Sequence, residues 1–254
     1  MPQEFQRYLD FLPELEQCDQ TELPLFHVCS YDNLVTYLSQ ARISEEKICN
    51  VFNKRIIYAF YGASKYKSAN LFKNASVGDQ SVCIILDIRH CNNISKIYPF
   101  DSGAASGTLD SIREYLMRWK ELQVKLDLGD RRERINKFIL HCFKSLDDYV
   151  KGKFDEMPAK TGDKKTLKAK IEDPVIFSHV SDVHGIILDN TLTDNRRYFV
   201  EVLFETDIQL MPEVIQGVII PTALFNAQKF KELLKKYRME NFIKENNLVY
   251  PSSI

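Results

Sequence analysis

Two hydrophobic patterns alternate along the chain, and each predicts a different element. Continuous apolar or β-branched runs are typical of buried strands, and they occupy residues 23–30, 54–62 and 81–88. The third run is the most apolar, so we expect it at the centre of a sheet. A helical repeat follows the first run, with Asp32 as its expected N-cap. The expected buried face of this helix holds Leu34, Tyr37, Leu38 and Ala41.

The middle of the chain carries helical patterns. Residues 109–126 and 135–152 repeat apolar side chains every three or four positions, and Gly152 is the expected end of the second helix. That second stripe consists of Ile135, Phe138, Ile139, Cys142, Phe143, Leu146 and Val150. Residues 151–170 are rich in lysine and poor in large apolar side chains. We expect an exposed, mobile loop there, and a loop that contacts phosphates is the alternative.

Strand patterns return in the C-terminal third. They occupy residues 173–180, 184–189, 197–205 and 214–221, and an amphipathic helix is expected over 222–238. Strands, a helical insertion and a strand-rich half are not a regular βαβ alternation. The pattern therefore predicts an α+β fold. We expect one domain over residues 1–254, with the helical insertion at about 109–152.

Composition narrows the function classes. The chain has 254 residues, 44% hydrophobic and 27% charged, with a net charge of −1, so it is not basic enough overall to be a general polyanion binder. Its six cysteines form no C-x-x-C pair and indicate reduced thiols. The sequence shows no signal-peptide pattern and no membrane-length apolar run, so we expect a cytoplasmic protein that does not contact a membrane. Phosphate-binding glycine motifs and H-E-x-x-H are absent, and we expect no metal.

Two polar residues interrupt apolar strands. His27 ends the first run beside a helix start, where it is either a core histidine bonded to a backbone carbonyl or a ligand-binding residue. Glu201 alternates with Phe199 and Leu203, so the three side chains share one face of a strand. An unpaired buried carboxylate is costly. Glu201 is therefore expected either to have a buried partner, such as a nearby basic side chain, or to open into a cleft.

A histidine, a tyrosine and a glutamate on three successive strand motifs resemble the H-Y-E branch of the ADP-ribosyltransferase fold. This branch includes diphtheria toxin, the poly(ADP-ribose) polymerases and the DarT toxins. His27-Val28-Cys29-Ser30 is similar to the H-x-T/S motif of the family, although Cys29 stands at a position usually held by threonine, serine or glycine. "IIYAFYGASKYKSAN" is similar to its tyrosine motif through Tyr58, and "RRYFVEVLFE" is similar to its glutamate strand through Glu201.

The resemblance implies a split β-sheet core and NAD as a substrate. His27, Tyr58 and Glu201 would be catalytic, with Glu201 stabilising the charge that develops as the nicotinamide–ribose bond breaks. The residues it assigns to NAD binding are His27, Val28, Ser30, Tyr58, Tyr61 and Tyr66. Arg196 and Arg197 precede the glutamate strand and would contact the acceptor or a phosphate. Phe199 replaces the glutamate of arginine-modifying members, so a guanidinium acceptor is not expected.

The implied activity is transfer of ADP-ribose from NAD to an unknown acceptor, a protein or a nucleic acid. NAD glycohydrolase activity and a role as a bacterial toxin or in phage defence fit the same resemblance. One alternative is an inactive module of this fold that binds a nucleotide, a nucleic acid or a protein. Another is a nucleic-acid-binding protein that uses the lysine-rich loop. The chain also resembles uncharacterised bacterial proteins with a "YPFDSGA" segment, in which we read Asp101 as a turn residue rather than a cleft residue.

Overall fold

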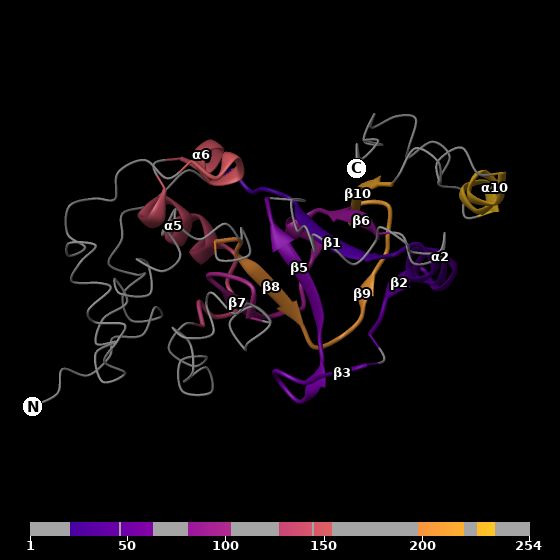
Figure 1. Ribbon diagram of the computed structural model, residues 1–254, viewed down its shortest axis with the longest axis horizontal. Coiled ribbons are helices and arrows are strands. Elements are labelled where there is room, and N and C mark those ends of the chain that lie inside the picture. Colours follow the sequence, from indigo (N-terminus) through magenta and orange to yellow (C-terminus); the bar gives the residue numbers. More distant parts are fainter. Residues whose placement is uncertain are drawn as a thin grey trace, which may run out of the picture. The chain divides into compact units, whose positions relative to one another are not determined.

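The computed structural model describes residues 21–45, 47–62, 81–102, 127–143, 145–153, 198–220 and 228–236. Within them, the chain is a mixed α and β protein whose core is an antiparallel sheet (Figure 1). The strand order of the six-stranded sheet is β10-β6-β1-β5-β8-β7. Its strands are β1 (Leu25–Ser30), β5 (Ile57–Tyr61), β6 (Ser81–Leu86), β7 (Ile94–Tyr98), β8 (Glu201–Phe204) and β10 (Ile215–Ile219). The α+β prediction is confirmed at this level.

The chain divides into two compact units. Unit 1 comprises residues 1–21 and 95–201, and unit 2 comprises residues 22–94 and 202–254. The boundary falls inside β8, so Glu201 belongs to unit 1 and the rest of the strand to unit 2. The single-domain organisation stays a prediction.

In unit 2, β1 lies between β5 and β6 and pairs antiparallel with both. Helix α2 (Tyr31–Gln40) follows directly, and its N-cap is Ser30, whose Oγ accepts the backbone N–H of Asn33 at 3.2 Å. The expected cap at Asp32 is therefore wrong, because the chain leaves β1 two residues earlier and Asp32 lies in the first turn. Asp32 still places a negative charge where the helix dipole favours it.

The predicted buried face of α2 is confirmed at Leu34, Tyr37 and Leu38, which are all buried. It fails at Ala41, which is exposed and lies just beyond the helix in the left-handed conformation, with φ of 51°. A helix ends where such a residue turns its N–H back onto the last carbonyls. In Ala41 this N–H bonds the carbonyls of Leu38 and Tyr37.

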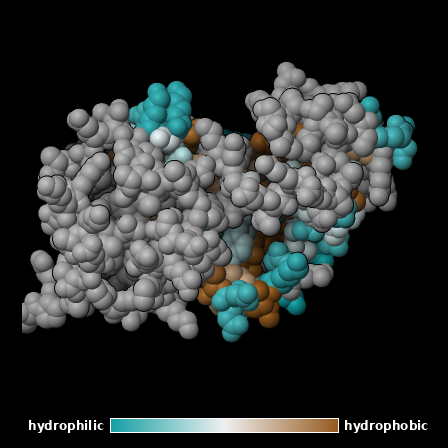
Figure 2. All heavy atoms as spheres, in the orientation of Figure 1, coloured by the Kyte–Doolittle hydropathy of each residue, from teal (hydrophilic) through white to brown (hydrophobic). Residues whose placement is uncertain are grey.

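The expected strand over residues 54–62 is two strands in the structure. Strand β4 (Lys54–Arg55) pairs with β3 (Ile48–Cys49) in a hairpin, and β5 begins after Ile56. Gly62 follows β5 with φ of 70°, a conformation that glycine adopts without strain. Ile48 is 61% exposed, and Figure 2 shows apolar spheres beside polar ones over this hairpin.

Strand β6 is buried at every position after Ser81, and it has hydrogen-bonded neighbours on both sides, β1 and β10. The strand is therefore an interior one, although it is second from the edge of the sheet and not at the centre where we expected it. A second, two-stranded sheet joins β2 (Arg42–Ile43) to β9 (Ile208–Gln209). Helix α10 (Gln228–Lys236) buries Phe230 at 6.0 Å from the ring of Tyr31.

In unit 1, the expected continuous helix over 135–152 is two helices, α5 (Glu133–Cys142) and α6 (Leu146–Lys151). Phe143 is extended, and the Ser145 hydroxyl accepts the backbone N–H of Asp148, which starts the second helix. Apolar spacing alone did not reveal this local cap. Gly152 ends α6 with φ of 63°, as predicted.

Several predicted elements lie outside the described residues. They are the helix over 109–126, most of the lysine-rich loop, and the strands over 173–180 and 184–189. No helix in the described part of the chain is long and apolar enough to cross a membrane.

Candidate functional site

His27 lies in β1 and is 7% exposed. Its Nδ1 lies 2.7 Å from the backbone carbonyl oxygen of Tyr58. A carbonyl only accepts, so Nδ1 carries the proton and Nε2 is the acceptor of the neutral ring. Burial lowers the pKa of His27, while the Tyr58 carbonyl and the charge of Glu45 raise it by smaller amounts. The lowered pKa favours the neutral imidazole.

The second ring nitrogen of His27 distinguishes it from an ordinary core histidine. Nε2 is buried and has no hydrogen-bond partner within the described ranges. The backbone contact that we set out for a structural histidine is present, but it satisfies only half of the imidazole. A buried acceptor without a donor costs about 1–3 kcal/mol. The geometry thus leaves one acceptor positioned to take a hydrogen bond from a hydroxyl or an N–H.

The surroundings of His27 are largely apolar. The ring of Tyr37, from α2, lies 5.8 Å from the imidazole at an interplanar angle of 52°. Cys29 follows on the same strand, and loss of solvent raises its pKa to about 12. A thiol with so high a pKa is protonated at neutral pH and is a poor nucleophile. The ring nitrogen of His27 is therefore the group in this neighbourhood best suited to polar recognition.

Tyr58 meets His27 through its main chain. Its own hydroxyl donates to Sγ of Cys49, in the β3–β4 hairpin, and Sγ also accepts the backbone N–H of Val51 at 3.3 Å. The side chain of Tyr58 is half-buried. The structure thus links the histidine and tyrosine motifs by a backbone contact and directs the phenol toward the hairpin.

The remaining residues assigned to NAD binding have varied positions. Tyr61 is 1% exposed, and its hydroxyl accepts the backbone N–H of Leu23 at 2.8 Å. Val28 is half-buried in β1, and Ser30 is the cap of α2. Their roles toward NAD stay predictions. Tyr66, Arg196 and Arg197 lie outside the described residues.

Glu201 begins β8 and is 1% exposed. Its Oε2 accepts the backbone N–H of Ser102 at 3.1 Å. The flanking residues Phe199 and Leu203 are buried too. Of the two expectations for this glutamate, burial is confirmed, and one of its partners is the backbone amide of Ser102. Sequence reasoning did not identify Ser102, although a polar segment directly after a buried strand was visible.

The segment around Ser102 contributes other buried polar groups to unit 1. Ser102 is fully buried and Asp101 is 5% exposed. Ser102 Oγ has no hydrogen-bond partner in the part of the chain that the structure describes. Tyr98, at the end of β7, has its pKa raised by burial and further by the charges of Asp127 and Glu201. Glu201 therefore belongs to a buried polar cluster contributed by β7, by the residues after it, and by β8.

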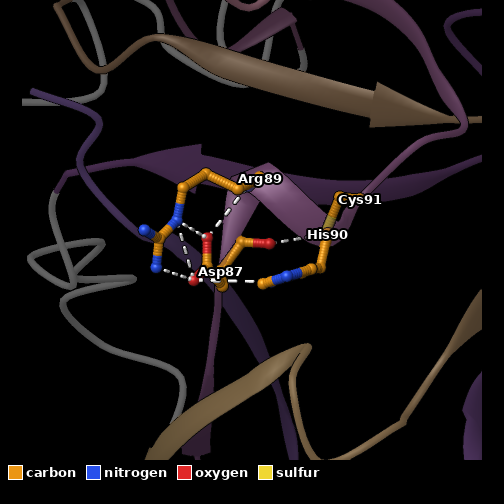
Figure 3. Close-up of polar contacts among 4 residues, drawn as sticks. All are labelled: Asp87, Arg89, His90 and Cys91. Atoms are coloured by element: carbon orange, nitrogen blue, oxygen red, sulfur yellow. Dashed lines mark hydrogen bonds and ion pairs between the residues drawn. The ribbon is translucent and has the colours of Figure 1, made fainter. Parts of the chain in front are cut away.

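A second polar cluster lies after β6, in unit 2 (Figure 3). Asp87 caps the short helix η3 (Ile88–His90), and its carboxylate accepts the backbone N–H and guanidinium of Arg89. These bonds hold the pKa of Asp87 well below its usual range. His90 approaches the same carboxylate at 3.5 Å, and Cys91 Sγ donates to the Asp87 carbonyl oxygen. This cluster closes a turn, and it is also tied to the neighbouring part of the chain, because the Asp87 N–H donates to the Val214 carbonyl oxygen at 2.7 Å and Gln216 bonds the Asp87 carboxylate.

The described residues contain no group of three or more histidine, cysteine or acidic side chains that would hold a metal ion. No family model, no curated protein and no solved structure matches this chain.

Proposed function

We propose that this protein is an ADP-ribosyltransferase of the H-Y-E type. It cleaves the nicotinamide–ribose bond of NAD and transfers ADP-ribose to a macromolecular acceptor, a protein or a nucleic acid. Hydrolysis of NAD is the same bond cleavage with water in place of the macromolecular acceptor. The proposed fold is correspondingly the split-sheet core of that family with a helical insertion.

One observation carries the proposal: His27 is held as a neutral imidazole whose buried Nε2 acceptor has no partner among the described residues. A ribose hydroxyl is a donor of the required kind. Burial excludes water that would otherwise compete for the nitrogen, so a hydrogen bond from substrate would fix its pose. A core histidine has no need of an unsatisfied acceptor.

Two further observations support the same function. The histidine and tyrosine motifs lie on neighbouring strands of unit 2, β1 and β5. Glu201 is a buried carboxylate with a fixed oxygen, which suits it to stabilise an oxocarbenium-like charge. In the proposed mechanism, Glu201 also bonds a ribose hydroxyl. The β1–β5 register pairs Leu25 with Tyr61 and Phe26 with Phe60, so the Tyr58 side chain lies on the face of β5 opposite to that of His27 and takes no part in this contact.

The test is nicotinamide release from labelled NAD by wild type, by Glu201→Gln and by a matched control, Glu205→Gln. Glu205 follows β8 and makes a surface pair with Lys54 at 2.9 Å, so its neutralisation changes a nearby charge outside the proposed site. We expect release by wild type and by the control, and a loss of about 100-fold or more in Glu201→Gln. Label recovered on protein or nucleic acid would identify the acceptor class.

Two results would contradict the proposal. Equal release by wild type and Glu201→Gln would remove the glutamate from the mechanism. No release, together with protection by NAD against thermal unfolding, would favour a module that binds the nucleotide without cleaving it.

A further inference from the structure

Helix α2 places a buried tyrosine beside the His27 imidazole, and the proposed function has not used it. The ring centroids of Tyr37 and His27 lie 5.8 Å apart, at an interplanar angle of 52°. Tyr37 is 5% exposed, so it is buried to about the same extent as His27. Both residues belong to unit 2. The two rings are therefore direct neighbours where α2 packs on β1.

The Tyr37 hydroxyl makes no hydrogen bond within the described ranges. The hydroxyls of two other tyrosines of unit 2, Tyr58 and Tyr61, each bond a neighbouring group. A phenol hydroxyl can donate, and the Nε2 atom of the neutral His27 ring can accept. Nε2 has no partner among the described residues, so these two complementary groups are not bonded to each other. A third polar group that accepts from one and donates to the other would satisfy both.

The charge near the two rings indicates what kind of group fits. Burial raises the pKa of Tyr37, with smaller contributions from Cys29 and Glu45. Glu45 also acts to raise the pKa of His27, against the larger effect of burial. A carboxylate whose charge acts on both rings disfavours a second anion, such as a phosphate, beside them. A ligand hydroxyl is neutral, and it donates one hydrogen bond while it accepts another.

From this geometry we infer that Tyr37 is a second ligand-binding residue of the His27 site. Its hydroxyl donates to a ribose hydroxyl of NAD, and His27 Nε2 accepts the proton of that same ribose hydroxyl. One ligand group thus satisfies two protein groups. The inference rests on the proposed function, since it names a recognition contact for the same substrate. Tyr37 takes part in binding and not in bond cleavage.

Helix α2 also offers a matched control for the loss of one tyrosine hydroxyl. Tyr31 lies on the same helix and is also 5% exposed, but its ring packs on Phe230 at 6.0 Å. Nicotinamide release from NAD is measured for wild type, Tyr37→Phe and Tyr31→Phe. We expect Tyr37→Phe to raise KM about 3- to 10-fold with kcat unchanged, because it removes one neutral hydrogen bond to the bound substrate. We expect Tyr31→Phe to stay within about twofold of wild type in both parameters.

Substrate analogues separate a lost contact from a change in packing. A set of NAD analogues, each of which lacks one ribose hydroxyl, is assayed with wild type and Tyr37→Phe. For one analogue we expect the two proteins to agree within about twofold in kcat/KM, because the hydroxyl that Tyr37 contacts is already missing. That analogue also identifies which ribose hydroxyl lies between Tyr37 and His27.

Several results would overturn the inference and leave the proposed function standing, provided that wild type releases nicotinamide and Glu201→Gln does not. One is an unchanged KM in Tyr37→Phe, and another is an equal rise in Tyr31→Phe. A third is a Tyr37→Phe effect of the same size for NAD and for every analogue, which would assign it to packing. A fall in kcat at constant KM would place the hydroxyl in the chemical step. A wild type that releases no nicotinamide overturns both proposals.

Discussion

Lowering the pH will destabilise this protein through His27, and the size of the effect follows from its burial. Burial lowers the pKa of His27 below its ordinary value of 6.5. The unfolded chain therefore binds a proton that the folded chain excludes, so stability falls as the pH drops. The stability that depends on a neutral His27 is fully present above pH 6.5, and it is lost as the pH falls from that value to the folded-state pKa. If folded His27 stays neutral, the loss from pH 7 to pH 5 is about 2 kcal/mol.

The matched variant is His27→Asn. The asparagine amide can replace Nδ1–H as the donor to the Tyr58 carbonyl, which the ring contacts at 2.7 Å, and it does not titrate. The free-energy cost of its smaller side chain is the same at every pH, so this cost cancels when the pH dependences of the two proteins are compared. Other titrating groups cancel in the same comparison.

The assay is urea unfolding followed by circular dichroism at pH 5, 6 and 7. We expect the free energy of unfolding of wild type to fall by up to about 2 kcal/mol more than that of His27→Asn. Parallel pH dependences would refute the reasoning. They would mean that His27 takes up its proton in the folded state, and Nε2 would then be a donor at low pH and no longer the acceptor assigned to it.

Three other substitutions test the packing around the site. Gly152→Ala should destabilise by about 2–4 kcal/mol, because φ is 63° and the new Cβ would lie 2.5 Å from the Tyr198 hydroxyl oxygen. Adding Tyr198→Phe should recover only the part of this loss that comes from the clash with the hydroxyl. If the two substitutions change the free energy of unfolding additively in a double-mutant cycle, the clash is not its cause. Tyr149→Phe leaves the buried Val200 N–H without its acceptor at 3.0 Å, so we expect a thermal or urea scan to show a loss of about 1–3 kcal/mol. Asp87→Asn should lower the free energy of unfolding by about 1–2 kcal/mol at neutral pH, a small loss because the guanidinium partner is exposed to solvent. The difference from wild type should shrink as the pH of the unfolding assay falls through the lowered pKa of Asp87.

Several features of the fold could be predicted because their causes are local. The apolar run of β6 requires burial whatever the topology, and the strand is an interior one. Gly152 ends α6 because glycine alone adopts a left-handed conformation without strain. The presence of a buried partner for Glu201 was also predictable, because an unpaired carboxylate in an apolar strand is costly.

Other features depend on competition between neighbouring residues. Ser30 and Asp32 are both good helix caps, and the end of β1 decides between them. The break between α5 and α6 arises where Ser145 captures the N–H of Asp148, although the apolar repeat continues through it. Hydrophobic periodicity reports which face is buried and is insensitive to such short interruptions.

The chemistry at the candidate site was decided by the tertiary structure. The sequence by itself placed a histidine and a glutamate in apolar strands. It did not give the tautomer of His27, which is fixed by a carbonyl 31 residues away, or the backbone amide that bonds Glu201 from 99 residues away. Hydrogen bonds act over about 3 Å, so residues that are distant in sequence can set them only after the chain has folded.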